Sequence, residues 1–200
     1  MSANLSRREK GPDTSGGFLR GKQSFSSLGS SSKKPPLTLS RALLGLTGAE
    51  REQVGLIVAG DGVLRSSFET ECCEALGTRC VFTGFVNQSR IGYVYAAADC
   101  LGLPSRWVET WGLVVNEALQ FGLPAVVSDR VGCHPELIDD GETGYIFRAG
   151  DANGLRNCLR KVLEMTPDRR RQTAERCRKV VSSYSVWNAV EGILYAVSDF

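Results

Sequence analysis

The sequence lacks several features on which common functional classes depend. Histidine occurs once, as His134, and the seven cysteines contain no Cys-x-x-Cys pair, so no set of residues has zinc-site spacing. No apolar run approaches the roughly 20 residues that cross a bilayer, and the basic first residues lack the apolar segment of a secretory signal. The net charge of +2 predicts no nucleic-acid partner. Cys80 and Cys100 lie in apolar segments, as is typical of a reducing compartment, so we expect a cytoplasmic protein without a transmembrane segment.

The distribution of charge and serine divides the chain into two parts. Residues 1–40 contain seven basic and two acidic residues and ten serines. We therefore expect residues 1–35 to be a low-order, basic, Ser/Gly-rich segment, in which residues 16–22 are compatible with an edge strand. Residues 36–200 have the composition of one ordinary folded domain.

Short apolar runs alternate with helical patterns through this domain. Strands are expected at 54–62, 80–84, 99–104, 124–129 and 143–147, the first two buried on both faces. Helices are expected at 37–46, 64–76, 89–98, 111–121 and 134–140, and from 151 onward with breaks at Pro167 and near 183–185. The alternation predicts an α/β fold: a Rossmann-like, doubly wound parallel sheet in a single domain, closed by C-terminal helices. Such sheets bind ligands at the carboxyl ends of their strands.

The most informative stretch is PSRWVETWGLVVNEALQFGLPAVVSD, residues 104–129. A helix that begins near Trp111 and Gly112 presents free N–H groups and a positive dipole end to an anion, and Gly112 allows close approach. Glu109 precedes this helix and Glu117 lies within it, with seven residues between them, so a phosphate at the helix start would have a carboxylate on either side. Two solvated glutamates are the alternative, but the apolar neighbours of Glu117 indicate that it needs a partner.

This stretch, followed by GCHPELIDDGETGYIF at 132–147, resembles the donor-binding half of the group 1 (family 4) glycosyltransferases, which have a two-domain B-type fold. The resemblance extends from about Val54 to Leu163. It implies that Glu109, the catalytic candidate, contacts hydroxyls of the transferred sugar and that Glu117 binds the ribose of the nucleotide. It also implies that the amides around Gly112 and Leu113, next to Trp111, hold the diphosphate.

The remaining family positions match less closely. Gly60 ends the first strand, and Phe85 and Val86 fall in the segment that contacts the nucleotide base in the family, largely through backbone groups. Family members also carry two cations that clamp the diphosphate, and the best counterparts here are Lys22 and Lys34. A solvated basic tail is the competing interpretation of these two lysines.

The resemblance predicts a hexosyltransferase donor domain that binds a nucleotide-diphospho-sugar and takes part in retaining transfer to a glycan or lipid-linked acceptor, without a metal or other cofactor. The family's acceptor domain has no counterpart before residue 18, so we expect either a separate acceptor-domain chain as a partner or that the chain is a truncated product. The basic helix expected at 169–181 is compatible with peripheral contact with an anionic membrane, although a solvated helix face is more common. Two alternatives stay open: a non-catalytic nucleotide-sugar-binding or regulatory module, and a nucleotide-sugar epimerase-like protein.

Overall fold

A computed structural model of the chain describes residues 23–28, 37–62 and 65–198. One six-stranded sheet has the order β3-β2-β1-β4-β5-β6, and every pair of neighbouring strands is parallel. The strands are β1 (Gln23–Leu28), β2 (Val54–Ala59), β3 (Cys80–Gly84), β4 (Cys100–Leu103), β5 (Ala125–Ser128) and β6 (Gly144–Phe147). The helices are α1 (Leu37–Leu44), α2 (Gly48–Glu52), α3 (Arg65–Leu76), η1 (Gly77–Arg79), α4 (Gln88–Ala97), α5 (Leu113–Gln120), α6 (His134–Leu137), α7 (Ala152–Leu163), α8 (Pro167–Ser182) and α9 (Val186–Ser198).

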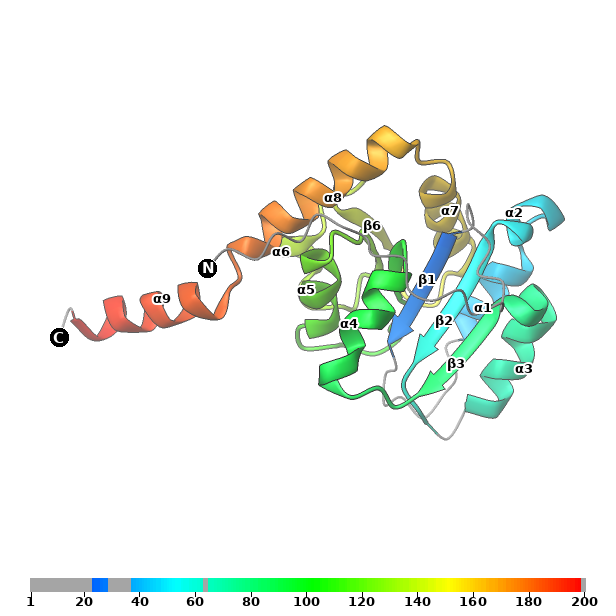
Figure 1. Cartoon of the computed structure of the whole chain (residues 1–200), viewed down its shortest axis with the longest axis horizontal. Helices are drawn as coiled ribbons and strands as arrows, with labels where there is room; N and C mark the ends of the chain where they lie inside the picture. Colours follow the sequence, from blue (N-terminus) through cyan, green and yellow to red (C-terminus); the bar gives the residue numbers. More distant parts are fainter. Residues whose placement is uncertain (1–22, 29–36, 63–64, 199–200) are drawn as a thin grey trace, which may run out of the picture.

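Helices cover both faces of this sheet (Figure 1). Successive residues of a strand point to opposite faces, so neighbours along one strand enter different cores. In β5, for example, Val126 packs into the core beneath α1, α3 and α7, whereas Ala125 and Val127 pack into the core beneath α4, α5 and α8. The structure thus confirms the expected doubly wound sheet.

The strand order places the ligand-binding position of the fold. The chain winds outward from β1 to β3 on one side and from β4 to β6 on the other. Adjacent crossovers therefore diverge between β1 and β4. Folds of this kind bind their ligands in the crevice that such a divergence makes at the carboxyl ends of the two strands, here called the β1–β4 crevice. The loop that follows β4 carries Glu109 directly into this region.

Two expectations about strands were wrong. β1 lies within the segment expected to be low-order with at most an edge strand, yet it pairs with β2 over six residues and with β4 on its other side. β3 was expected to be buried on both faces, but it is the edge strand and Val81 is exposed. Residues 16–22, which include Lys22, lie outside the described residues, as does Lys34.

The C-terminal helices break where the sequence predicts. α8 begins at Pro167, and α9 follows a short turn after Ser182 and projects away from the body of the domain (Figure 1). Much of the positive charge of α8 is bonded within the domain: Arg169 pairs with Glu142 at 2.8 Å, and Arg178 donates to the carbonyl of Phe121. Within the described residues, no helix combines the length and apolar character that would let it cross a membrane.

Candidate nucleotide-sugar site

The loop between β4 and α5 holds Glu109 at the carboxyl edge of the sheet. The Ser105 hydroxyl donates a hydrogen bond to Glu109 Oε2 (2.6 Å), and the backbone carbonyl of Ser105 accepts one from the Ser128 hydroxyl (2.6 Å). The Glu109 amide donates to the carbonyl of Arg130 (2.9 Å), which extends the sheet by one short bridge to Val131. Because both its side chain and its backbone are bonded, the Glu109 carboxylate is held in one orientation.

The N-terminus of α5 follows this loop at once. Gly112 precedes the helix with φ +98°, a left-handed conformation that favours glycine, and a Cβ at this position would lie 2.7 Å from Val131 Cγ1. Leu113, the first helical residue, is exposed, so the first turn of the helix opens to solvent. The Val115 amide already donates to the Gly112 carbonyl (2.8 Å), so the amides of Leu113 and Val114, together with the helix dipole, are the groups that would favour an anion here.

Glu117 lies one turn further along α5 and has two side-chain partners on α4. The Tyr95 hydroxyl donates to Glu117 Oε2 (2.7 Å), and the Gln88 amide donates to Oε1 (3.1 Å). Burial, reinforced by the bond to Glu117, raises the pKa of Tyr95 far above its usual value, so its hydroxyl stays protonated as a donor. A carboxylate has about four acceptor positions, and two therefore remain for a ligand.

Gly60, Phe85 and Val86 lie at the carboxyl ends of β2 and β3. The Gly60 amide donates to the carbonyl of Gly84 (2.7 Å), and both glycines have positive φ, +125° and +68°. Val86 is half-buried, whereas the Phe85 ring is 84% exposed. The segment after β3 therefore offers backbone groups and one open aromatic ring.

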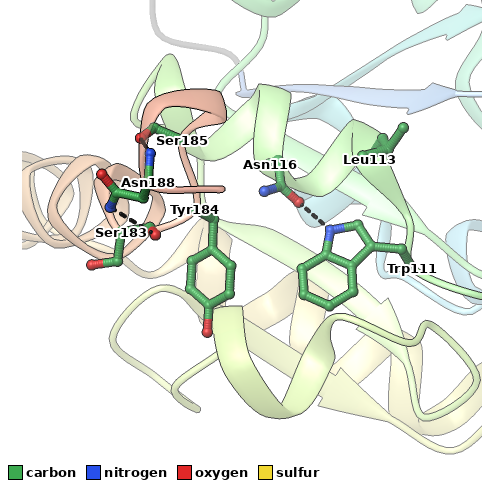
Figure 2. Close-up of a pocket in the computed structure, with 7 residues that line it drawn as sticks. All are labelled: Trp111, Leu113, Asn116, Ser183, Tyr184, Ser185 and Asn188. Carbon is green, nitrogen blue, oxygen red and sulfur yellow. Dashed lines mark hydrogen bonds between the residues drawn. The ribbon is translucent and has the colours of Figure 1, made fainter. Parts of the chain in front are cut away.

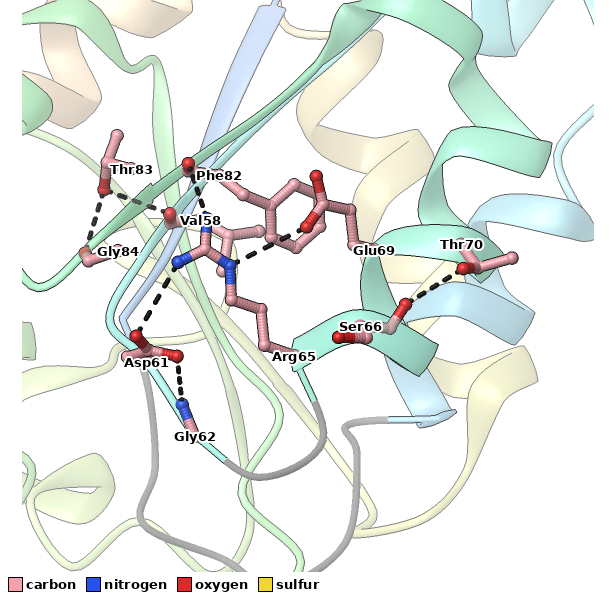
Figure 3. Close-up of polar contacts among 10 residues, drawn as sticks. All are labelled: Val58, Asp61, Gly62, Arg65, Ser66, Glu69, Thr70, Phe82, Thr83 and Gly84. Carbon is pink, nitrogen blue, oxygen red and sulfur yellow. Dashed lines mark hydrogen bonds and ion pairs between the residues drawn. The ribbon is translucent and has the colours of Figure 1, made fainter.

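Arg65, which the sequence analysis missed, ties these two strand ends together (Figure 3). Its guanidinium donates to the carbonyl of Phe82 (3.2 Å) and lies 3.7 Å from a carboxylate oxygen of both Asp61 and Glu69. Arg65 therefore links the residues after β2 to β3, beside the bridge between Gly60 and Gly84.

The structure thus gathers the predicted residues in two groups. Glu109, Trp111, Gly112, Leu113 and Glu117 share one loop and helix beside the β1–β4 crevice. Gly60, Phe85 and Val86 form a second group on the neighbouring strand ends. Within the part of the chain that the structure describes, no three His, Cys, Asp or Glu side chains are arranged to hold a metal ion.

Comparison with known protein families shows to which family this chain belongs. The family model described as glycosyl transferases group 1 matches residues 23–180. The chain belongs to the group 1 glycosyltransferases. This assignment supports the expected transferase and neither the regulatory-module nor the epimerase alternative.

The proteins similar to this glycosyltransferase chain differ in how much of their own length it covers. Sulfoquinovosyl transferase SQD2 of Arabidopsis thaliana is 36% identical over 113 residues, which are 55% of this chain and 21% of that protein. HepE of Anabaena, solved with UDP, has a TM-score of 0.76 at 23% identity over 90% of this chain and 50% of HepE. The C-terminal domain of LpcC, a glycosyl transferase group 1 family protein from Francisella tularensis, has a TM-score of 0.69 at 20% identity, covering 83% of this chain and 88% of that one.

These likenesses show the fold of the glycosyltransferase chain, which spans about half of HepE and about a fifth of SQD2. The fold is one Rossmann-like half of the two-domain B-type fold. The matched residues also begin at Gln23, the first residue of β1, in agreement with its place inside the sheet.

Proposed function

We propose that this chain is the donor-binding half of a retaining hexosyltransferase and binds a nucleotide-diphospho-sugar in the β1–β4 crevice. The observation that carries the proposal is the placement of Glu109 and Glu117 on either side of the α5 N-terminus, with both carboxylates fixed by hydrogen bonds. HepE, a neighbour in fold, was solved with UDP and with UDP-glucose, and this makes UDP-glucose the first donor to test.

The proposed roles follow from the charge of each group. The diphosphate lies against the first-turn amides of Leu113 and its neighbours. The positive end of the helix dipole stabilises the negative charge that grows there as the leaving group departs. Glu109 accepts hydrogen bonds from hydroxyls of the transferred sugar. Glu117 accepts from the ribose hydroxyls through the two acceptor positions that Tyr95 and Gln88 leave open.

Other parts of the proposal concern the base and the phosphate clamp. Gly60 and the backbone at Phe85 and Val86 are proposed to border the base. Their position after β2 and β3, at the same edge of the sheet, supports this role. Lys22 and Lys34 remain proposed clamp residues. We further propose that transfer needs no metal, since the α5 amides and these cations would balance the diphosphate charge.

Calorimetry with UDP-glucose, GDP-mannose and ADP-glucose tests donor binding. Glu117→Gln and Glu109→Gln should each lower the affinity for the preferred donor about tenfold or more. Each removes a charged acceptor, whose hydrogen bonds are worth about 1.5–3 kcal/mol. Glu52→Gln, at an exposed position of α2, is the matched control and should bind as the native chain does. Unchanged affinity in Glu117→Gln would overturn the site assignment.

The acceptor side is proposed to come from a second domain or chain that brings a glycan or lipid-linked acceptor. The coverage of HepE, about half, supports a missing half. α9 supports it as well, because Trp187, Ile193, Leu194 and Val197 are each more than 60% exposed. We place the reaction in the cytoplasm, with any membrane contact peripheral. Transfer from the preferred donor, assayed with and without cell extract, should occur only when the extract supplies the acceptor half.

A further inference from the structure

A pocket beside α5 shares Trp111 and Leu113 with the proposed donor site, but its other five lining residues have no role in that site. Its volume is about 410 Å³, within the range of small-molecule sites, and it lies between the start of α5 and the turn that joins α8 to α9 (Figure 2). Trp111, Leu113 and Asn116 contribute one wall, and Ser183, Tyr184, Ser185 and Asn188 contribute the other.

Two aromatic rings give the pocket its apolar surface. The centroids of Trp111 and Tyr184 are 5.9 Å apart, and their planes are inclined by 44°. The indole is fixed, because its Nε1 donates to Asn116 Oδ1 at 2.7 Å. Tyr184 is 40% exposed, so a ligand can reach its ring. The partly negative faces of the aromatic rings favour the weakly positive C–H groups on one face of a saturated ring.

The polar groups of the lining offer both donors and acceptors. Asn116 spends its oxygen on Trp111, and none of the contacts described for it uses the amide nitrogen. Asn188 shows the opposite pattern, because its amide nitrogen donates to the carbonyl of Ser183 (3.0 Å) and its oxygen is left for a ligand. The Ser185 oxygen accepts from the Asn188 backbone amide (3.1 Å), which leaves the hydroxyl proton.

The lining contains no charged side chain. A phosphate or carboxylate would therefore find no cation in it, and an ammonium group would find no anion. A purely apolar ligand would leave the amide and hydroxyl groups unpaired. A neutral polyhydroxyl ring satisfies both requirements, since each hydroxyl can donate and accept and its C–H face can stack on an aromatic ring.

We propose that this pocket binds a neutral pyranose of a glycan, as a sugar subsite separate from the carboxylates of the donor site. That the sugar belongs to the acceptor rests on the proposed function, because the pocket adjoins the helix that is proposed to hold the donor. That a neutral sugar binds here does not depend on it.

The test uses the whole chain with maltose as the neutral probe and saturation-transfer NMR as the measure of binding. Maltose should receive saturation, and its Kd should rise about fivefold or more in Tyr184→Ala. Tyr184→Phe keeps the ring and should bind maltose within about twofold of the native chain. Trp187→Ala is the matched control, since that indole is exposed and does not line the pocket. Glucose 1-phosphate should bind more weakly than maltose once UDP occupies the donor site.

A second measurement needs no variant, so it tests the subsite even if the Tyr184→Ala chain fails to fold. In the native protein, maltose should shift the NMR signals of the Asn116 side-chain amide. The absence of saturation transfer to maltose would overturn the subsite, and so would transfer that is unchanged in a folded Tyr184→Ala chain. The subsite would also be overturned if maltose left the NMR signals of the Asn116 side-chain amide unshifted.

Calorimetry with UDP on the same samples separates the two proposals. A chain that binds UDP but not maltose retains the proposed donor function and lacks the subsite. A chain that binds maltose but not UDP has the subsite and lacks the donor function. Glu117→Gln should bind UDP about tenfold or more weakly and bind maltose as the native chain does, whereas Tyr184→Ala should weaken maltose binding about fivefold or more and leave UDP binding unchanged.

Discussion

Gly132 lies where two loops of the site touch, and it gives the sharpest test of how Glu109 is positioned. A Cβ at residue 132 would lie 2.1 Å from the Thr110 carbonyl oxygen and 2.9 Å from that of Glu109. Both obstacles are backbone atoms, which cannot rotate aside as a flexible side chain does. The Gly132 amide also donates to the Glu109 carbonyl (2.9 Å), so the clash would strain this bond directly.

Gly132→Ala should therefore force the Glu109 loop away from the turn after β5 by roughly 1 Å, the shortfall from an ordinary contact. Overpacking of this kind costs about 1–3 kcal/mol of the free energy of unfolding. For a domain of this size, that corresponds to a Tm lower by about 2–12 °C. The shift would also move the carboxylate that is proposed to contact the donor sugar, so donor affinity should fall about tenfold or more.

Thermal unfolding and donor calorimetry on the same preparation measure both effects. Gly48→Ala is the matched control, because no atom lies within 4 Å of its added Cβ and the residue is in a helix. Its stability should be unchanged or higher by up to about 1 kcal/mol. A Gly132→Ala chain with native Tm and native donor affinity would refute the argument that this contact positions Glu109.

Three further predictions concern other parts of the domain. Iodoacetamide at pH 8 should modify Cys73 alone among the seven thiols of the folded chain. Cys73 is exposed, whereas burial raises the pKa of Cys80 to about 12. Mass spectrometry of the Cys73→Ser variant should then show no label. The hydrogen bonds from Arg160 and then from the Thr47 backbone lower the pKa of Glu50 from 4.5 to about 2. They stabilise the folded chain by under about 1 kcal/mol. This stabilisation is complete above pH 4.5 and is lost as the pH falls toward 2. The Tm difference between the native chain and Glu50→Gln should narrow over that interval, and a constant difference would contradict the pairing. Ile193→Lys, on the exposed face of α9, should change the unfolding free energy by less than about 0.5 kcal/mol, and a larger loss measured in urea would show that α9 packs on the domain.

The sequence predicted most of the elements from residue 37 onward from their apolar runs and periods. It missed α2 (Gly48–Glu52), because none of the residues of this helix is buried and it has no apolar face. Glu109, Gly112 and Glu117 could be identified from the sequence for a different reason, since they fall within one continuous motif. β1 was missed because QSFSSL has only two apolar residues, and the backbone pairing on both sides supplies what its side chains do not signal.

The partners of the site could not be predicted, because they depend on packing between separate elements. Tyr95 reaches Glu117 across 22 positions of the chain, and only the placement of α4 against α5 brings them together. Arg65 and the Trp111–Tyr184 pocket depend likewise on contacts between distant segments. Periodicity reports which face of a helix is apolar but not which neighbour that face meets.

The position of β1 has a consequence for how the domain is made. β1 precedes the other five strands of the sheet in the chain, yet its two neighbours are β2, about 30 residues later, and β4, which starts at Cys100. Neither edge of β1 can be satisfied by a local hairpin, so the nascent chain must keep the strand unpaired until distant segments leave the ribosome. The six residues with the weakest sequence signal therefore join two half-sheets, β2–β3 and β4–β5–β6. A fragment that begins at residue 36 would leave those half-sheets with facing, unpaired edges prone to aggregation.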